Sequence, residues 1–67
     1  MAQSWRAMHQ TYELYLRDAA QRTRFEPLTC RTAGQVMHKI REILEADESV
    51  AAVEVRLAGE HLFTLDR

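Results

Sequence analysis

The residue best suited to nucleophilic chemistry in this 67-residue chain is Cys30, its only cysteine. It directly precedes Arg31 and Thr32, where a helix is expected to begin. A helix N-terminus and a neighbouring cation both favour the thiolate, which is the nucleophilic form of cysteine. A catalytic or redox thiol also needs an orienting base, and no sequence pattern around Cys30 supplies one. We therefore predict no catalytic role for this residue.

Metal and phosphate chemistry is not indicated by the remaining residue types. None of the three histidines, His9, His38 and His61, lies at a metal-ligand spacing from another histidine or from Cys30. The two glycines are isolated, so the chain lacks a glycine-rich phosphate-binding loop. The sequence accordingly predicts no metal, no cofactor and no enzymatic activity.

Arginine side chains offer the clearest binding chemistry. Several arginines lie on or near the first expected hairpin, and Tyr15 next to them could stack on a base. An RNA-binding sheet normally presents two or more aromatic side chains, and we count one here. The candidate partner-binding residues are Tyr15, Arg17, Arg22, Arg24 and Arg56.

The charge of the chain is small but unevenly distributed. A formal net charge of −1 argues against a strong general attraction to nucleic acid. Residues 1–31 carry five arginines and three acids, whereas residues 32–67 carry four basic and seven acidic side chains. Two halves of opposite sign suit self-complementary docking, but ordinary solvated surfaces are the more common explanation of such a pattern.

The first expected elements are two strands. Residues 11–17 (TYELYLR) alternate between apolar and polar types, which predicts a half-buried strand. Residues 18–23 are polar and predict a turn. Residues 24–30 (RFEPLTC) predict a second strand, and Pro27 confines it to an edge of the sheet because proline donates no ladder hydrogen bond.

A helix is predicted from residue 33 to about Ala46 or Asp47. Thr32 and Gln35 fit a capping box, in which each side chain satisfies a free backbone N–H of the first turn. Apolar side chains recur at helical spacing from Ala33 to Leu44. Ion pairs at i,i+4 are expected for His38–Glu42 and Arg41–Glu45. Three acids follow at the negative end of the helix dipole, where they are either solvated or paired with a cation: Glu45, Asp47 and Glu48.

The last two strands are expected at residues 50–57 and 61–66, joined by a turn at residues 58–60. Two registers are possible. A three-residue loop pairs Val55 with Phe63 and builds an apolar face, whereas a two-residue loop at Gly59 and Glu60 would place Leu62 and Thr64 there. We prefer the first register because it buries more apolar surface.

These elements predict an α+β fold of ββαββ order. The expected structure is a four-stranded antiparallel sheet, strand order 2-1-3-4, with one helix packed on one face. This order places Pro27 on an edge strand and leaves the other sheet face uncovered. The predicted core is Leu14, Leu16, Leu28, Val36, Met37, Ile40, Leu44, Val53, Val55, Leu57, Phe63 and Leu65.

Size and composition favour a single domain over residues 11–67, preceded by a tail or short helix at residues 1–10. A chain this short buries a small core, and one cysteine excludes an internal disulfide. Self-association is therefore expected to add stability. The longest uninterrupted apolar run, residues 50–53, is too short to cross a bilayer. We expect a cytoplasmic protein without a membrane partner.

The segment Tyr12-Glu-Leu-Tyr-Leu-Arg-Asp18, the helix ending Arg41-Glu-Ile-Leu44 and the closing hairpin resemble small uncharacterised bacterial proteins, many from alphaproteobacteria. The resemblance covers about residues 11–66. It implies the same element order, and it implies no active residues because the function of that group is unknown.

Two functional hypotheses follow from these patterns. The first is a small protein-interaction module that associates with itself, as a homodimer, or with another protein through a sheet face or edge. The alternative is a nucleic-acid-binding accessory protein that uses the arginines of the first hairpin.

Overall fold

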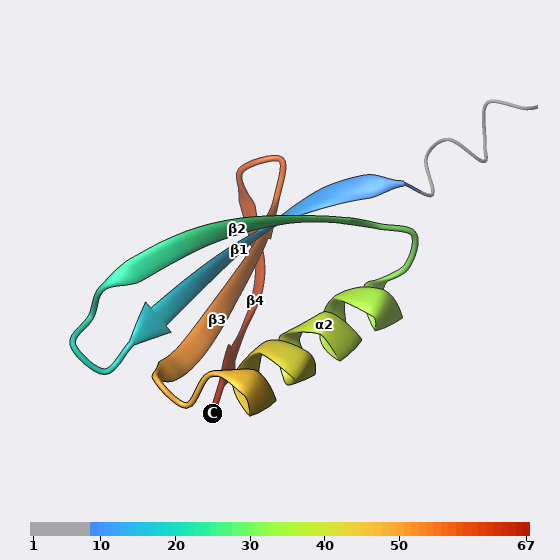
Figure 1. Ribbon diagram of the computed structural model, residues 1–67. Coiled ribbons are helices and arrows are strands. Elements are labelled where there is room, and N and C mark those ends of the chain that lie inside the picture. The colour runs from blue at the N-terminus through green and yellow to red at the C-terminus, as the bar shows by residue number, and fades with distance from the viewer. Residues whose placement is uncertain (1–8) are drawn as a thin grey trace, which may run out of the picture.

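The computed structural model describes residues 9–67, which form four strands and one helix (Figure 1). The elements are β1 (Gln10–Asp18), β2 (Thr23–Cys30), α2 (Ala33–Ala46), β3 (Val50–Leu57) and β4 (Glu60–Asp66). The tail or short helix expected at residues 1–10 falls mostly on residues 1–8, outside the described part of the chain. Gln10 already belongs to β1.

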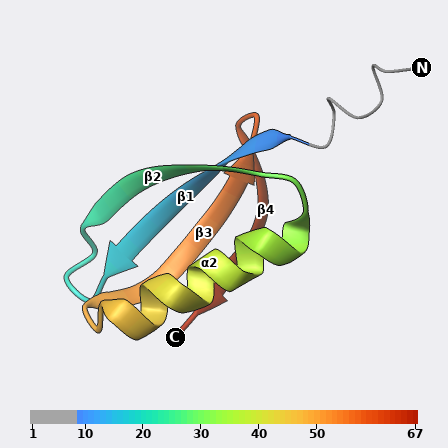
Figure 2. The same cartoon turned by 45° about the vertical axis from the view of Figure 1, so that its right-hand side comes forward.

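The four strands form one antiparallel sheet in the order β2-β1-β3-β4, which confirms the predicted ββαββ fold. Helix α2 connects β2 to β3 and lies along one face of the sheet (Figure 2). This crossing returns the chain to the sheet beside β1, so every neighbouring pair runs antiparallel. Pro27 lies on the edge strand β2, where its missing N–H can be tolerated.

The core lies between α2 and the inward side chains of the two central strands. Leu14 faces Val55 and Leu16 faces Val53 across the β1–β3 pair, and all four are buried. Val36 and Ile40 of α2 are buried against them. Partly buried side chains complete this layer: Leu28, Met37, Ile43, Leu44, Leu57, Phe63 and Leu65.

Two details of the predicted core change in the structure. Tyr12, Cys30, Val50 and Ala52 are also buried, although the predicted core omits them. Ala33, expected to begin the apolar face of the helix, is exposed. The first buried residue of α2 is Val36, because the first turn of the helix is used for capping and does not reach the core.

The turn between β1 and β2 is organised by one carboxylate. Asp18 Oδ1 accepts hydrogen bonds from the backbone N–H groups of Ala20 and Arg22, each at 2.9 Å. The Arg22 side chain donates to Asp18 Oδ2 at 3.1 Å. These contacts hold Gln21 in the left-handed region with a φ of 68°. The predicted turn is confirmed, with Asp18 and Thr23 themselves belonging to the strands.

Helix α2 begins as its sequence predicts. The Gln35 N–H donates to the Thr32 hydroxyl at 3.3 Å, and Gln35 Oε1 accepts from the Thr32 N–H at 3.3 Å. The capping box is therefore formed. The expected His38–Glu42 pair is present at 3.2 Å, whereas Arg41 and Glu45 do not approach within ion-pair distance.

The other end of α2 is held by residues distant in sequence. Arg67 donates through Nη2 to the carbonyl oxygens of Leu44 and Asp47 at 2.8 and 2.7 Å, and through Nε to the Val50 carbonyl at 2.8 Å. Arg24 pairs with the Asp47 carboxylate at 3.5 Å. Two arginines from outside the helix thus supply the positive charge that its own last turn lacks.

The second hairpin has the preferred register but not the predicted loop. Val55 faces Phe63 and Val53 faces Leu65, as expected. The turn has two residues, Ala58 and Gly59, with φ angles of 53° and 83°. A bulge in β4 accommodates one additional residue between His61, which faces Arg56, and Phe63, which faces Val55. This bulge makes the two-residue turn compatible with the apolar pairing.

Candidate functional site: the open face of the sheet

The side of the sheet that points away from α2 is called the open face here. Along each strand, its side chains alternate with those of the core. Within residues 9–67 there is only one helix, and it covers the opposite side (Figure 2). The residues on the open face are Thr11, Glu13, Tyr15 and Arg17 of β1, Thr23, Phe25, Pro27 and Thr29 of β2, Ala52, Glu54 and Arg56 of β3, and His61, Leu62, Thr64 and Asp66 of β4.

An aromatic pair lies at the β1–β2 side of the open face. Tyr15 and Phe25 are direct cross-strand neighbours, with ring centroids 5.3 Å apart and ring planes inclined by 49°. Tyr15 is half-buried, whereas the Phe25 side chain is 53% exposed. A phenylalanine this exposed leaves apolar surface in water that a binding partner could cover.

The charged groups next to this pair divide into two sets. On β3, Arg56 Nη1 contacts Glu54 Oε2 at 3.0 Å, and Arg56 Nη2 donates to the Gly59 carbonyl at 2.7 Å. This ion pair therefore forms along one strand and not across two. On β1, Glu13 and Arg17 have no ion-pair partner within 4 Å among residues 9–67.

The structure brings together only some of the predicted partner-binding residues. Tyr15, Arg17 and Arg56 share the open face. Arg22 lies in the β1–β2 turn, bound to Asp18. Arg24 points to the helix side of the sheet, where it pairs with Asp47. The arginines of the first hairpin therefore do not form one patch, because strand alternation and the turn direct them three ways.

Phe25 is the residue of this face that the sequence reading missed. The sequence predicts one aromatic side chain on this face, and the structure shows two. The signal was present in the alternation of residues 24–30. Once Leu28 is assigned to the core, Phe25 at the odd position must point away from it.

Cys30 lies outside the open face, on the helix side of β2. It is 9% exposed, and burial raises the pKa of its thiol. Its Sγ lies 3.7 Å from the Thr32 carbonyl oxygen, the acceptor available to the S–H group. Desolvation thus opposes the thiolate that the nearby helix N-terminus and Arg31 would favour.

No cluster of three or more histidine, cysteine, aspartate or glutamate side chains suited to a metal ion occurs between residues 9 and 67. In the same part of the chain, α2 is the single helix, and it is too short and too polar to cross a membrane.

Comparison of the chain with protein-family models, with curated proteins and with solved structures finds no match. The resemblance to small bacterial proteins stays a prediction. The functional argument therefore rests on the geometry of the open face and of the surfaces around it.

Proposed function

We propose that this protein is a small interaction module that self-associates as a homodimer through the open face of its sheet. The observation that carries the proposal is the order of side chains along β1. Glu13 and Arg17 are opposite charges without ion-pair partners in the described residues, and they flank the aromatic Tyr15 at equal spacing.

This order is self-complementary. In a two-fold dimer, residue i contacts residue j of the other copy and residue j contacts residue i. If two copies pack face to face with their β1 strands antiparallel about Tyr15, Glu13 of each copy meets Arg17 of the other. Two ion pairs then surround an apolar centre made by the Tyr15–Phe25 pairs, an arrangement typical of interfaces with an aromatic core and a polar rim.

The size of the face suits a small interface that supports weak association. Strands of seven to nine residues, spaced about 4.8 Å apart, give the sheet a projected area on the order of 500 Å². Side-chain relief increases the accessible surface beyond this value. A standard interface buries about 800 Å² per partner, and the described chain has an accessible surface of 4782 Å².

The deciding experiment is sedimentation equilibrium over micromolar to millimolar protein concentrations. Arg17→Glu should weaken association by at least about tenfold, because it places like charges opposite Glu13. The double variant with Glu13→Arg and Arg17→Glu should restore association, since the swapped charges again complement each other. A purely monomeric wild type, or a double variant no better than the single one, would contradict the proposal.

A matched pair of apolar truncations locates the interface. Phe25→Ala and Leu62→Ala each remove an exposed apolar side chain from an edge strand, and the wild-type residues are 53% and 45% exposed. Leu62 also lies on the open face but on the far edge strand β4, whereas Phe25 contacts Tyr15, so Phe25→Ala should weaken the dimer more than Leu62→Ala. Greater weakening by Leu62→Ala would contradict an interface centred on Tyr15.

A second candidate function is the binding of single-stranded nucleic acid on the same face. The Tyr15–Phe25 pair favours it, because two neighbouring aromatic rings next to Arg17 could stack successive bases. Glu13→Lys separates the two functions. It should strengthen binding of a fluorescent oligonucleotide at low salt and weaken self-association. Unchanged fluorescence anisotropy with DNA and RNA oligonucleotides would exclude the second candidate.

A further inference from the structure

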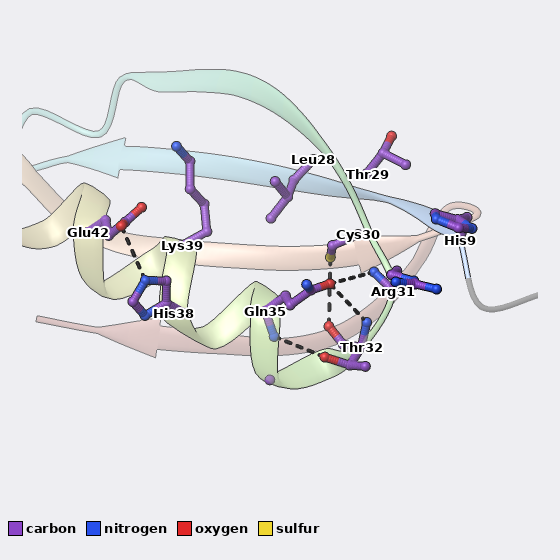
Figure 3. A pocket seen from close by; sticks show the side chains of 11 residues that line it. His9, Leu28, Thr29, Cys30, Arg31, Thr32, Gln35, His38, Lys39 and Glu42 are labelled. Carbon is purple, nitrogen blue, oxygen red and sulfur yellow. Dashed lines mark hydrogen bonds and ion pairs between the residues drawn. The ribbon is translucent and has the colours of Figure 1, made fainter.

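A groove separates the edge strand β2 from helix α2 on the side opposite the open face (Figure 3). Its volume is about 640 Å³. Leu28 and Cys30 point into it from β2, and Lys39 extends from α2 toward the sheet beside them (Figure 3). We call this depression the β2–α2 groove.

The β2–α2 groove continues along the strand. A second depression of about 300 Å³ shares Lys39 and Glu42 with it and extends to Arg24 and Asp47. Between Cys30 and Arg24 the strand advances by six residues, or about 20 Å. This length matches an extended segment of about six residues.

The outer edge of β2 has hydrogen-bonding groups available to such a segment. The Asp18 N–H donates to the Arg22 carbonyl at 2.9 Å and so closes the β1–β2 ladder. In an antiparallel pair, every second residue directs its N–H and C=O outward, which makes Phe25, Pro27 and Thr29 the outward residues. Pro27 removes one donor from this edge and leaves its carbonyl acceptor in place.

The charges at the β2–α2 groove are unequal at its two ends. Toward the start of the helix, Arg31 and Lys39 have no ion-pair partner within 4 Å among the described side chains. Glu42 lines both depressions and contacts His38 at 3.2 Å, and Glu26 of β2 lines only the second depression, next to Arg24 and Asp47. Toward the end of the helix, Arg24 is neutralised by Asp47. The available positive charge therefore lies beside Leu28 and Cys30.

We propose that the β2–α2 groove binds an extended acidic peptide segment of another protein. The segment adds to the edge of β2, places apolar side chains over Leu28 and Cys30, and directs a carboxylate between Arg31 and Lys39. Main-chain hydrogen bonds to an edge strand supply affinity in this mode of recognition, and the side-chain pockets supply specificity. The site is separate from the open face, so a dimer could bind one segment per copy.

The test uses two acetylated and amidated hexapeptides labelled with fluorescein, one of alternating valine and glutamate and one of alternating valine and lysine. At low salt, the glutamate peptide should bind at least about tenfold more tightly than the lysine peptide. Amide resonances of Leu28, Arg31 and Lys39 should shift on titration. Equal affinities, no binding of either peptide at millimolar concentration, or shifts confined to the open face would each overturn the proposal.

A matched pair of helix variants tests the charge argument. Lys39→Glu reverses a charge in the β2–α2 groove, and Arg41→Glu reverses one on the exposed side of the same helix. Only Lys39→Glu should lower affinity for the glutamate peptide by at least about tenfold. Lys39→Gln, a milder change, should give a smaller loss, and circular dichroism checks that each variant folds. Equal losses for Lys39→Glu and Arg41→Glu would contradict a site in the groove.

Discussion

The two faces of the sheet are built from alternate residues of the same strands, yet they differ in packing, charge and exposure. On the helix side, Leu14, Val53, Val55 and Ile40 are fully buried. On the open face, the same two central strands present Tyr15, Glu54 and Arg56, none of which is fully buried. The helix side holds the fold together, and the open face is the surface proposed for a partner.

This difference has a physical cause. One helix covers one side of a four-stranded sheet, and the core of a chain this short is small. The opposite side must then be either polar enough to face water or covered by another molecule. The open face combines both properties, since its charges on β3 are paired while Phe25 remains 53% exposed. Substitutions on the two faces should therefore affect different measurements.

The largest effect on stability is expected from Ile40→Ala on the helix side. Ile40 is 0% exposed, and removing its branched side chain leaves a cavity between α2 and the sheet. The free energy of unfolding should fall by about 2–5 kcal/mol, measured by urea denaturation at a concentration where the protein is monomeric. Arg41→Ala on the exposed side of α2 should change it by less than about 0.5 kcal/mol. Similar losses for both would mean that the helix does not pack as described.

A smaller effect is expected from Arg67→Ala, which removes the hydrogen bonds that fix the end of α2 to β3. Hydrogen bonds from a charged group are worth about 1.5–3 kcal/mol when buried, and solvent reduces this value here. We expect a loss of about 1–2 kcal/mol and faster amide exchange near residues 44–50. Arg67→Lys should recover only part of the loss, because an ammonium group lacks the planar fork that spans separate carbonyls. Unchanged exchange in this segment would contradict the clamp.

On the open face, the Tyr15–Phe25 contact should contribute less to folding. A double-mutant cycle of Tyr15→Ala and Phe25→Ala, measured on the monomer, should give a coupling of about 0.5–1 kcal/mol. Phe25→Ala should therefore affect self-association more than stability. A coupling larger than the loss caused by Ile40→Ala would remove the distinction between the two faces.

The smallest effect on stability is expected at acid pH, where the carboxylates of Asp18 and Asp47 become protonated. Backbone and side-chain hydrogen bonds from Arg22 lower the pKa of Asp18, and hydrogen bonds from Ser49 and the Arg24 charge lower that of Asp47. A carboxylate with a lowered pKa in the folded state stabilises the fold above its unfolded pKa of about 4. That stabilisation is lost as pH falls through the folded pKa.

Urea midpoints measured between pH 6 and pH 2 test this expectation. The urea midpoint of the wild type should decrease as the pH is lowered below about 4. The urea midpoint of the variant with Asp18→Asn and Asp47→Asn should decrease less steeply. Arg22→Ala should reproduce part of the change through Asp18. Parallel pH profiles for the wild type and the double variant would show that other carboxylates dominate acid unfolding.

Prediction from the sequence succeeded where the interacting residues are close in the sequence, and it failed where they are distant. The start of α2 was predictable because Thr32 and Gln35 are three residues apart and satisfy each other. The end of α2 was not, because Arg67 reaches Leu44 and Asp47 from 23 and 20 residues away. The candidate site divides in the same way. Tyr15 and Arg17 followed from alternation within β1, whereas the contact between Tyr15 and Phe25 required the β1–β2 register.

By itself the sequence determined the element order, the strand order, the helix start and which residues of β1 face the core. Each of these depends on periodicity, capping or the missing N–H of Pro27, which act within a few residues. Only the tertiary structure decided the bulge in β4, the pairing of Arg24 with Asp47, and the clamp made by Arg67. These features arise when segments distant in sequence come into contact, and local pattern carries no information about which distant groups will meet.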